Sequence, residues 1–467
     1  MFITLLFHTT FLLQGTWSCQ YFFFYAIIAV VENQHLEKIC RDVLDYNQSG
    51  SHTMPAPDLY PHQWLWDSCF IAIGLRHYDV ARAKAEIESL LDAQWANGMV
   101  PHMVFDPAKQ FRRDRQVWRS WVNPFSTEHA TSGITQPPLL AEAVWRIGEK
   151  MKKSEARLWY KQVLPALVRH HEWLMSERDP HGEGLVLQIH PWETGLDNTP
   201  VWMKQLHEHS KPWWIAAIEK LKLDGIITML RRDTSKMPPG ERITNTEALI
   251  IFDMIRRFRR KNYNIKKILH RSLFCIEDIS FNAILARNNQ IIVELAEQAR
   301  MKLSDDLTER MTRQNAALQK CWSEQDGMFY SRDFITHDLL NTPTIASLLP
   351  LYSRAITKDQ AARLVELMKD HGQFGAKHPC PSVPLSSEYF DADRYWSGPS
   401  WINTNWLLID GLMHYGFDQE ADELRRQSLS LVESAGPSEY FSPIDGSAHG
   451  ADSFSWTAAL TLDLLRS

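Results

Sequence analysis

Two carboxylates and a tryptophan lie between prolines in the stretch His190-Pro191-Trp192-Glu193-Thr194-Gly195-Leu196-Asp197-Asn198-Thr199-Pro200. Gly195 and Asn198 favour tight turns, so the pattern predicts a loop rather than a helix. Carboxylates beside an aromatic plane suit a sugar, because its ring stacks on Trp and its hydroxyl groups bond to Asp and Glu. The alternative is a polar loop whose acidic side chains only cap the next helix.

Amphipathic helical segments alternate with aromatic loops on both sides of this stretch. Residues 32–46 repeat apolar side chains at i, i+3, i+4 and i+7, which is typical of a helix with one buried face. The same periodicity recurs at residues 69–78, 80–95, 139–149, 159–176, 246–259, 276–301, 307–322, 344–352, 359–370, 402–415, 418–434 and 456–465. About a dozen helices with few strands predict an all-α fold. We expect paired helices to close into a toroid over residues 32–467, with the loops at one mouth.

The bulk composition excludes several classes of protein. The chain has 467 residues, of which 44% are hydrophobic and 23% charged, so a large ordered core is expected. A net charge of -6 argues against a nucleic-acid partner, whose binding site would be basic. Eighteen tryptophans, many beside polar residues or glycine, indicate a wet aromatic cleft. We therefore expect a small-molecule carbohydrate as partner.

Cysteine and histidine patterns give no sign of a disulfide framework or metal site. Six scattered cysteines without a C-x-x-C pair are typical of a reduced cytoplasmic protein, although their even number leaves disulfides open. The clusters His170-His171-Glu172 and His207-Glu208-His209 lack the HExxH spacing of a zinc site. We expect no metal and no cofactor.

The first 31 residues contain no Asp, Glu, Lys or Arg. A membrane anchor, a signal peptide and a start codon assigned too far upstream each account for this segment. Against a signal peptide, the segment has no basic start and no A-x-A cleavage pattern. Membrane association is expected only if residues 1–31 are kept as an anchor.

Three further stretches carry candidate site residues. Trp64, Trp66 and Asp67 precede a helical run and form either a sugar-binding corner or a buried Trp pair capped by Asp67. Arg231-Arg232-Asp233 contains two guanidinium groups that can clamp a carboxylate, or pair locally with the Asp. Glu439 lies on a loop between prolines, and with Asp197 it supplies the two acids that glycoside hydrolysis requires.

Five ordered motifs resemble glycoside hydrolase family 63, especially its bacterial mannosylglycerate and glucosylglycerate hydrolases. They are YPHQWLWDSCF (60–70), TSGITQPP (131–138), HPWETGLDNTP (190–200), YWSGPSWINTNW (395–406) and SEYFSPIDG (438–446). The resemblance implies an (α/α)6 barrel and an inverting α-glycosidase with Asp197 as general acid and Glu439 as general base. Their carboxyl groups would then lie about 6.5–9.5 Å apart. The substrate-binding residues expected from it are Tyr60, Trp64, Trp66, Asp67, Gln136, Trp192, Glu193, Arg231, Arg232, Tyr395, Trp396, Gly398 and Trp401.

Some parts of the chain depart from this pattern. Residues 1–31 have no place in it, residues 243–260 lack the expected polar aromatic character, and residues 450–454 lack a polar sugar contact. A trehalase or an oligosaccharide α-glucosidase of the same clan, a toroid epimerase and a non-catalytic sugar-binding protein are the alternatives. The choice between glucose and mannose, the leaving group and a homo-oligomeric state stay open.

Overall fold

The computed structural model describes residues 33–209, 212–221, 231, 237–238 and 240–466. Six inner helices form a closed ring, in which each packs against the next and the last packs against the first. In ring order they are α2 (Leu65–Leu75), α5 (Leu140–Gly148), α13 (Ile279–Ala299), α15 (Pro350–Ser353), α17 (Ile402–Tyr415) and α19 (Ser455–Leu464). All eleven residues of α2 are buried, as expected for a helix enclosed on every side.

An outer helix precedes each inner helix in the chain. The outer set consists of the helix at residues 33–46, α3 (Val80–Asp92), α6 (Lys153–Glu177), α14 (Asp305–Ala317), α16 (Lys358–Lys369) and α18 (Asp418–Ala435). These helices are amphipathic; α3, for example, buries Ala83, Ile87 and Leu90 on one face. The alternation of outer and inner helices confirms the predicted all-α (α/α)6 barrel.

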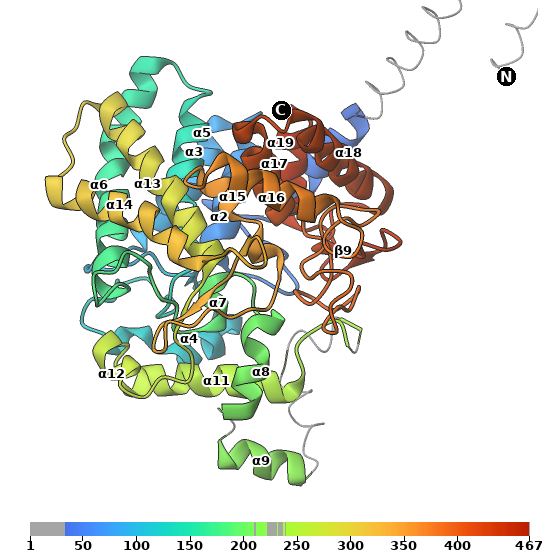
Figure 1. Cartoon of the computed structure of the whole chain (residues 1–467). Coiled ribbons are helices and arrows are strands. Elements are labelled where there is room, and N and C mark those ends of the chain that lie inside the picture. The colour runs from blue at the N-terminus through green and yellow to red at the C-terminus, as the bar shows by residue number, and fades with distance from the viewer. Residues whose placement is uncertain (1–32, 210–211, 222–230, 232–236, 239, 467) are drawn as a thin grey trace, which may run out of the picture.

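A group of additional helices lies on one side of the toroid (Figure 1). It comprises α4 (Arg112–Trp118), α8 (Pro200–His209), α9 (Trp213–Lys220), α11 (Asn245–Arg260) and α12 (Ile265–Leu269). Helix α11 contacts α4, α8 and α9, so it joins the group. Its start is defined by a capping box, in which Thr244 and Glu247 each bond to the other's backbone N–H.

Two-residue antiparallel strands link loops that are distant in sequence. The pairs are β1 (Gln48–Ser49) with β2 (His52–Thr53), β3 (Gln63–Trp64) with β4 (Met103–Val104), β5 (Ile276–Glu277) with β8 (Arg332–Asp333), β6 (Trp322–Ser323) with β7 (Met328–Phe329), and β9 (Tyr440–Phe441) with β10 (Ala448–His449). The described residues also contain short 3-10 turns at Lys109–Phe111, Ser120–Val122, Leu318–Cys321 and Ile345–Ser347. The β3–β4 and β9–β10 pairs position Trp64 and Glu439, respectively, beside the mouth of the toroid.

Several predicted boundaries were wrong: the helix expected at 344–352 is a 3-10 turn and the short helix α15, and the helix expected at 307–322 ends at Ala317. Two other errors concern the site. Helix α2 begins at Leu65 and not at Cys69, so Asp67 lies in its first turn rather than before it. The predicted loop at 190–200 contains the single helical turn α7 (Pro191–Thr194). Pro191 presets the helical φ angle and His190 Nδ1 accepts a hydrogen bond from the backbone of Trp192, which together nucleate this turn.

Buried ion pairs join the inner helices near their C-terminal ends. Asp463 on α19 binds Arg76 Nη1, which follows α2, over 2.7 Å. Arg146 on α5 binds Asp410 on α17 over 2.6 Å, and Arg354, which follows α15, binds the other oxygen of Asp410 over 2.7 Å. The network connects neighbouring helices of the ring through charges that are held away from water.

Five described cysteines, Cys40, Cys69, Cys275, Cys321 and Cys380, are buried and free. Burial raises the pKa of the Cys40 thiol to about 12, so it stays protonated at neutral pH. Among the described helices, none combines the length and the apolar character needed to cross a bilayer. The predictions for residues 1–31 and for Cys19 lie outside the described residues.

Candidate active site

Asp197 lies just after α7, at the mouth of the toroid. Its Oδ2 accepts a hydrogen bond of 3.0 Å from the phenol of Tyr395, which comes from the loop before α17. Burial raises the pKa of Asp197 to about 7, while the Tyr395 hydrogen bond and the charge of Arg242 act in the opposite direction. A carboxyl group with this pKa can carry a proton near neutral pH and donate it to a substrate oxygen.

Glu439 precedes β9 and is held by three donors. Its Oε1 accepts a hydrogen bond of 2.9 Å from Tyr60, and its Oε2 accepts one of 2.9 Å from the backbone of Ala451. The guanidinium of Arg242 forms an ion pair with the same Oε2. The structure therefore brings Asp197 and Glu439 into one site, connected through Tyr395 and Arg242.

Arg242 is one of the residues that the sequence reasoning missed. It is 9% exposed and lies between a turn, in which the Glu241 N–H donates to the Pro238 carbonyl, and the capping box of α11. Its contact with Glu439 spans 197 residues of sequence. The neighbouring turn and cap indicate a fixed chain entry into α11, but no local pattern marks this arginine as a partner of a distant carboxylate.

Five aromatic rings, which we call the aromatic floor, pack against one another next to the loops that carry Asp197 and Glu439. They are Trp66, Trp396, Trp401, Tyr440 and Trp456. Trp396 and Trp401 stack with centroids 3.8 Å apart and planes 4° apart, and both are 1% exposed. Gly195 has a φ of +77° and lies so close to Trp66 that a Cβ atom would be 2.6 Å from its ring. The floor thus supports the loop that carries Asp197.

A second set of rings, the aromatic wall, consists of Trp64, His102, Trp118 and Trp192. Trp64 meets the His102 ring edge-on, with ring centroids 4.9 Å apart. Trp192 stacks on the same His102 ring, with centroids 6.1 Å apart. Trp64 and Trp192 are both half-buried, so they differ from the floor in retaining accessible surface. Accessible aromatic surface is what a sugar ring stacks against.

Asp67 is not the N-cap of α2, which leaves the capping role expected as its alternative unfilled. The helix cap is Trp64, which makes no side-chain cap bond, and Asp67 is buried as the third residue of α2. Burial raises the pKa of Asp67 well above its usual value, and the charges of Glu439 and Asp197 act in the same direction. The three carboxyl groups therefore share one region of the mouth.

Several buried polar atoms near the floor and wall have no hydrogen-bond partner among the described residues. They are Trp64 Nε1, His102 Nε2, Gln136 Oε1, Arg242 Nε and Trp456 Nε1. Buried polar groups in folded proteins are nearly always satisfied by protein, water or ligand, so these five atoms can bind a polar ligand or water. His102 and Trp456 were absent from the sequence-based set.

Both carboxylate oxygens of Glu193 are bound by other groups of the protein. Arg178 binds it with both ends of its fork, over 2.6 and 2.8 Å, and the backbone of Ile189 and Thr135 donates over 2.8 and 3.3 Å. Glu193 is 0% exposed. This ion pair fixes α7 to the residues before it. We therefore do not include Glu193 among the proposed substrate contacts, although the sequence analysis expected it there.

The remaining candidates occupy different surroundings. Gly398 allows two parts of the loop before α17 to touch, because a Cβ atom there would lie 2.1 Å from the carbonyl oxygen of Asp391. Arg231 is half-buried and its Nη1 donates to Asn245 over 3.0 Å. Arg232 lies outside the described residues. Gly398 thus shapes the Tyr395 loop through its backbone.

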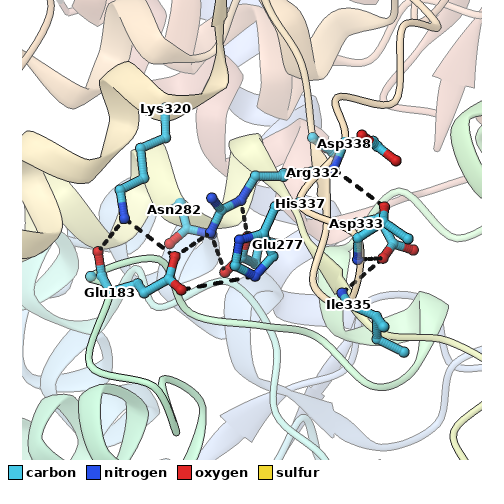
Figure 2. A network of polar contacts seen from close by, with 12 residues as sticks. Glu183, Glu277, Asn282, Lys320, Arg332, Asp333, Ile335, His337 and Asp338 are labelled. Carbon is cyan, nitrogen blue, oxygen red and sulfur yellow. Dashed lines mark hydrogen bonds and ion pairs between the residues drawn. The ribbon is translucent and has the colours of Figure 1, made fainter.

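One His–Glu–His group among the described residues has the spacing of a metal site. The ligand atoms of His181, Glu183 and His337 lie within 4.8 Å of one another. Figure 2 shows that Glu183 also binds Arg332 over 3.1 Å and Lys320 over 3.3 Å. Two fixed cations oppose the binding of a third, so we interpret the group as an ion-pair network and assign it no metal.

Comparison with known proteins places this site in a family. The mannosylglycerate hydrolase MGH1-like glycoside hydrolase domain matches residues 60–457. The chain belongs to this family of glycoside hydrolases. The mannosylglycerate hydrolase of Thermus thermophilus is 35% identical over 427 residues, which cover 90% of this chain and 98% of that protein. The glucosylglycerate hydrolase of Mycolicibacterium hassiacum is 30% identical, with 90% and 95% covered.

Solved structures agree with this assignment. A family 63 mannosylglycerate hydrolase of Thermus thermophilus, in complex with Tris and D-glycerate, superimposes with a TM-score of 0.82 at 35% identity, covering 91% of this chain and 99% of that chain. The neutral trehalase Nth1 of Saccharomyces cerevisiae, at 16% identity and a TM-score of 0.55, shares the fold. The resemblance to family 63 and the enzyme class predicted from sequence are confirmed.

Proposed function

We propose that this protein hydrolyses a small α-glycoside of glycerate, either mannosylglycerate or glucosylglycerate, with inversion of configuration. The observation that carries the proposal is the pairing of Asp197, whose pKa is about 7, with Glu439, which is ion-paired to Arg242. One carboxyl group is suited to donate a proton and the other to accept one. The relatives that act on these two glycosides support the choice of substrate class.

The reaction is a single displacement. Asp197 donates its proton to the glycosidic oxygen as the bond from that oxygen to the anomeric carbon breaks. Glu439 removes a proton from a water molecule whose oxygen forms the new bond on the opposite face. Glycerate leaves with the proton of Asp197, and the free sugar carries the hydroxyl group from water. The buried aromatic surroundings exclude bulk solvent, and this strengthens the electrostatic interactions of Asp197 and Glu439 with the reacting atoms.

The substrate contacts divide between the two ends of the bond. Trp64, Trp66, Asp67 and Trp396 form the proposed sugar subsite, with Trp192 adding to its wall. Tyr395 and Gln136 face the leaving group. Arg231 or Arg232 pairs with the glycerate carboxylate, since a charge-assisted hydrogen bond contributes about 1.5–3 kcal/mol.

A small substrate panel tests this function. The enzyme is incubated with mannosylglycerate, glucosylglycerate, trehalose and kojibiose, and proton NMR follows the first-formed sugar. We expect turnover of a glycerate glycoside with initial release of the β-anomer. Initial release of the α-anomer would reject the single displacement, and turnover of trehalose or kojibiose alone would reject the substrate class. Mannose and glucose incubated alone test for epimerisation.

A further inference from the structure

We propose that Arg242 is a positioning residue for the general base: it fixes the orientation of the Glu439 carboxylate. The inference rests on the proposed function, because it assigns Arg242 a role through Glu439. Arg242 lies directly before residues 243–260, where the sequence departs from the family pattern.

Arg242, Tyr60 and Glu439 form a closed triangle of polar contacts. Arg242 Nη2 pairs with Glu439 Oε2, while Nη1 donates to the Tyr60 hydroxyl over 2.8 Å. That hydroxyl in turn donates to Glu439 Oε1 over 2.9 Å. A carboxylate held at both oxygens cannot rotate. With the backbone of Ala451 also on Oε2, three of its roughly four acceptor sites are filled, which leaves one for water.

The guanidinium itself is confined by aromatic rings. Its central carbon lies 4.4 Å from the ring centroid of Tyr395 and 5.8 Å from those of Tyr60 and Tyr440. Such rings stabilise a cation through their electron-rich faces and exclude water from it. The planar guanidinium, with its two donor nitrogens, fits between these rings, whereas a lysine ammonium would present a single point charge.

The residues flanking Arg242 are tied to the hairpin that follows Glu439. Glu241 Oε1 contacts His449 Nδ1 over 3.0 Å, and the Glu241 carbonyl accepts from the Tyr440 hydroxyl over 3.2 Å. Further along, Glu247 pairs with Arg394 over 3.0 Å. The position of Arg242 relative to Glu439 is therefore defined from both sides and does not depend on its own ion pair alone.

Arg242 acts electrostatically on both carboxylates of the site. It is the direct ion-pair partner of Glu439, and its charge lowers the pKa of Asp197 against the stronger effect of burial. Removing the charge therefore raises the pKa of Asp197, so Asp197 keeps its proton to higher pH. The alkaline limb of the activity profile reports the acid, so this limb should move to higher pH.

The test compares Arg242→Gln with Tyr395→Phe and Arg242→Lys. For Arg242→Gln we expect kcat to fall about 10²-fold or more, because base catalysis contributes about 10²–10⁴-fold. KM should change little, and the alkaline limb of the kcat/KM profile should shift to higher pH. Tyr395→Phe removes the hydroxyl that donates to Asp197 and keeps the ring against Arg242, so it should shift the alkaline limb and lower kcat less than Arg242→Gln does. Arg242→Lys should retain the alkaline limb but not the full kcat.

Arg394→Gln serves as the structural control, because it loosens the same segment without touching either carboxylate. If it reproduces the fall in kcat and the shift of the alkaline limb, or if Arg242→Gln keeps the wild-type kcat or changes only KM, the positioning role is wrong. Circular dichroism and thermal unfolding check that each variant folds. Profiles are measured on whichever panel substrate the wild type hydrolyses, so a wrong glycerate assignment is recognised separately from a wrong role for Arg242.

Discussion

The hydroxyl of Tyr395 donates a hydrogen bond of 3.0 Å to Asp197, and so stabilises the ionised form of the carboxyl group that we propose as the general acid. Burial opposes this effect and raises the pKa of Asp197 to about 7. The balance keeps a substantial protonated fraction at neutral pH without making the acid too weak to donate.

The pH dependence of activity should reflect this balance. We expect kcat/KM of the wild type to fall above about pH 7 as Asp197 loses its proton. In Tyr395→Phe the lost hydrogen bond no longer lowers the pKa, so the alkaline limb should move to higher pH. Initial rates between about pH 4 and 9 measure the shift. A limb that stays in place or moves downward would contradict the assignment of Asp197 as the acid.

The two carboxylates should differ in how their loss depends on the leaving group. Asp197→Asn should lose least on aryl glycosides with good leaving groups, which need little protonation. Glu439→Gln should lose activity on all substrates, because water activation is required for each. A series of aryl glycosides with leaving groups of decreasing pKa provides the measurement. Equal dependence in both variants would show that the roles are assigned wrongly.

Arg231 should bind the carboxylate of a charged leaving group. Arg231→Ala should raise KM for a glyceryl glycoside by roughly 10-fold, since a charge-assisted hydrogen bond contributes about 1.5–3 kcal/mol. Its effect on a neutral aryl glycoside of the same sugar should be small. Asn245→Ala, which removes the partner of Arg231 Nη1, is the matched control for loss of local structure. Equal losses on charged and neutral substrates would reject the carboxylate role.

The Arg178–Glu193 ion pair should stabilise the acid loop through the fold. Arg178→Met leaves the fully buried Glu193 without its cation and should destabilise the protein by about 3–5 kcal/mol in urea unfolding. Adding Glu193→Gln should recover part of that loss, because no charge is then left unpaired. A single variant with wild-type stability would show that water reaches Glu193.

Asp463 should matter for stability and not for catalysis. Burial alone would raise its pKa, but the hydrogen bond from His77 and the charges of Arg76 and Arg146 outweigh it and hold the pKa well below its usual range. A lowered folded-state pKa contributes stability above the unfolded-state pKa that is lost as pH falls through the folded-state pKa. Asp463→Asn should therefore cost about 3 kcal/mol at about pH 6–8 and progressively less below about pH 4. Urea unfolding at several pH values measures this difference.

Much of the architecture could be read from the chain because it follows from local rules. Apolar periodicity located most helices of the toroid, since a helix must bury one face whatever it packs against. The boundary errors at Leu65 and Pro191 arose because the start of a helical turn there depends on capping residues and on neighbouring aromatic rings. The pairing of Asp197 with Glu439 was expected from the ordered motifs, and the shared surroundings of the two residues agree with it.

Residue type and spacing alone predict the helical class, the order of the motifs and the two proposed acids, Asp197 and Glu439. The contacts of each polar side chain follow only from the folded chain. It paired Glu193 with Arg178 instead of leaving it exposed to a ligand, and it brought Arg242 to Glu439 across 197 residues. The physical reason is that a buried charge must find a partner in space, and nothing in the local sequence specifies which distant residue that partner is.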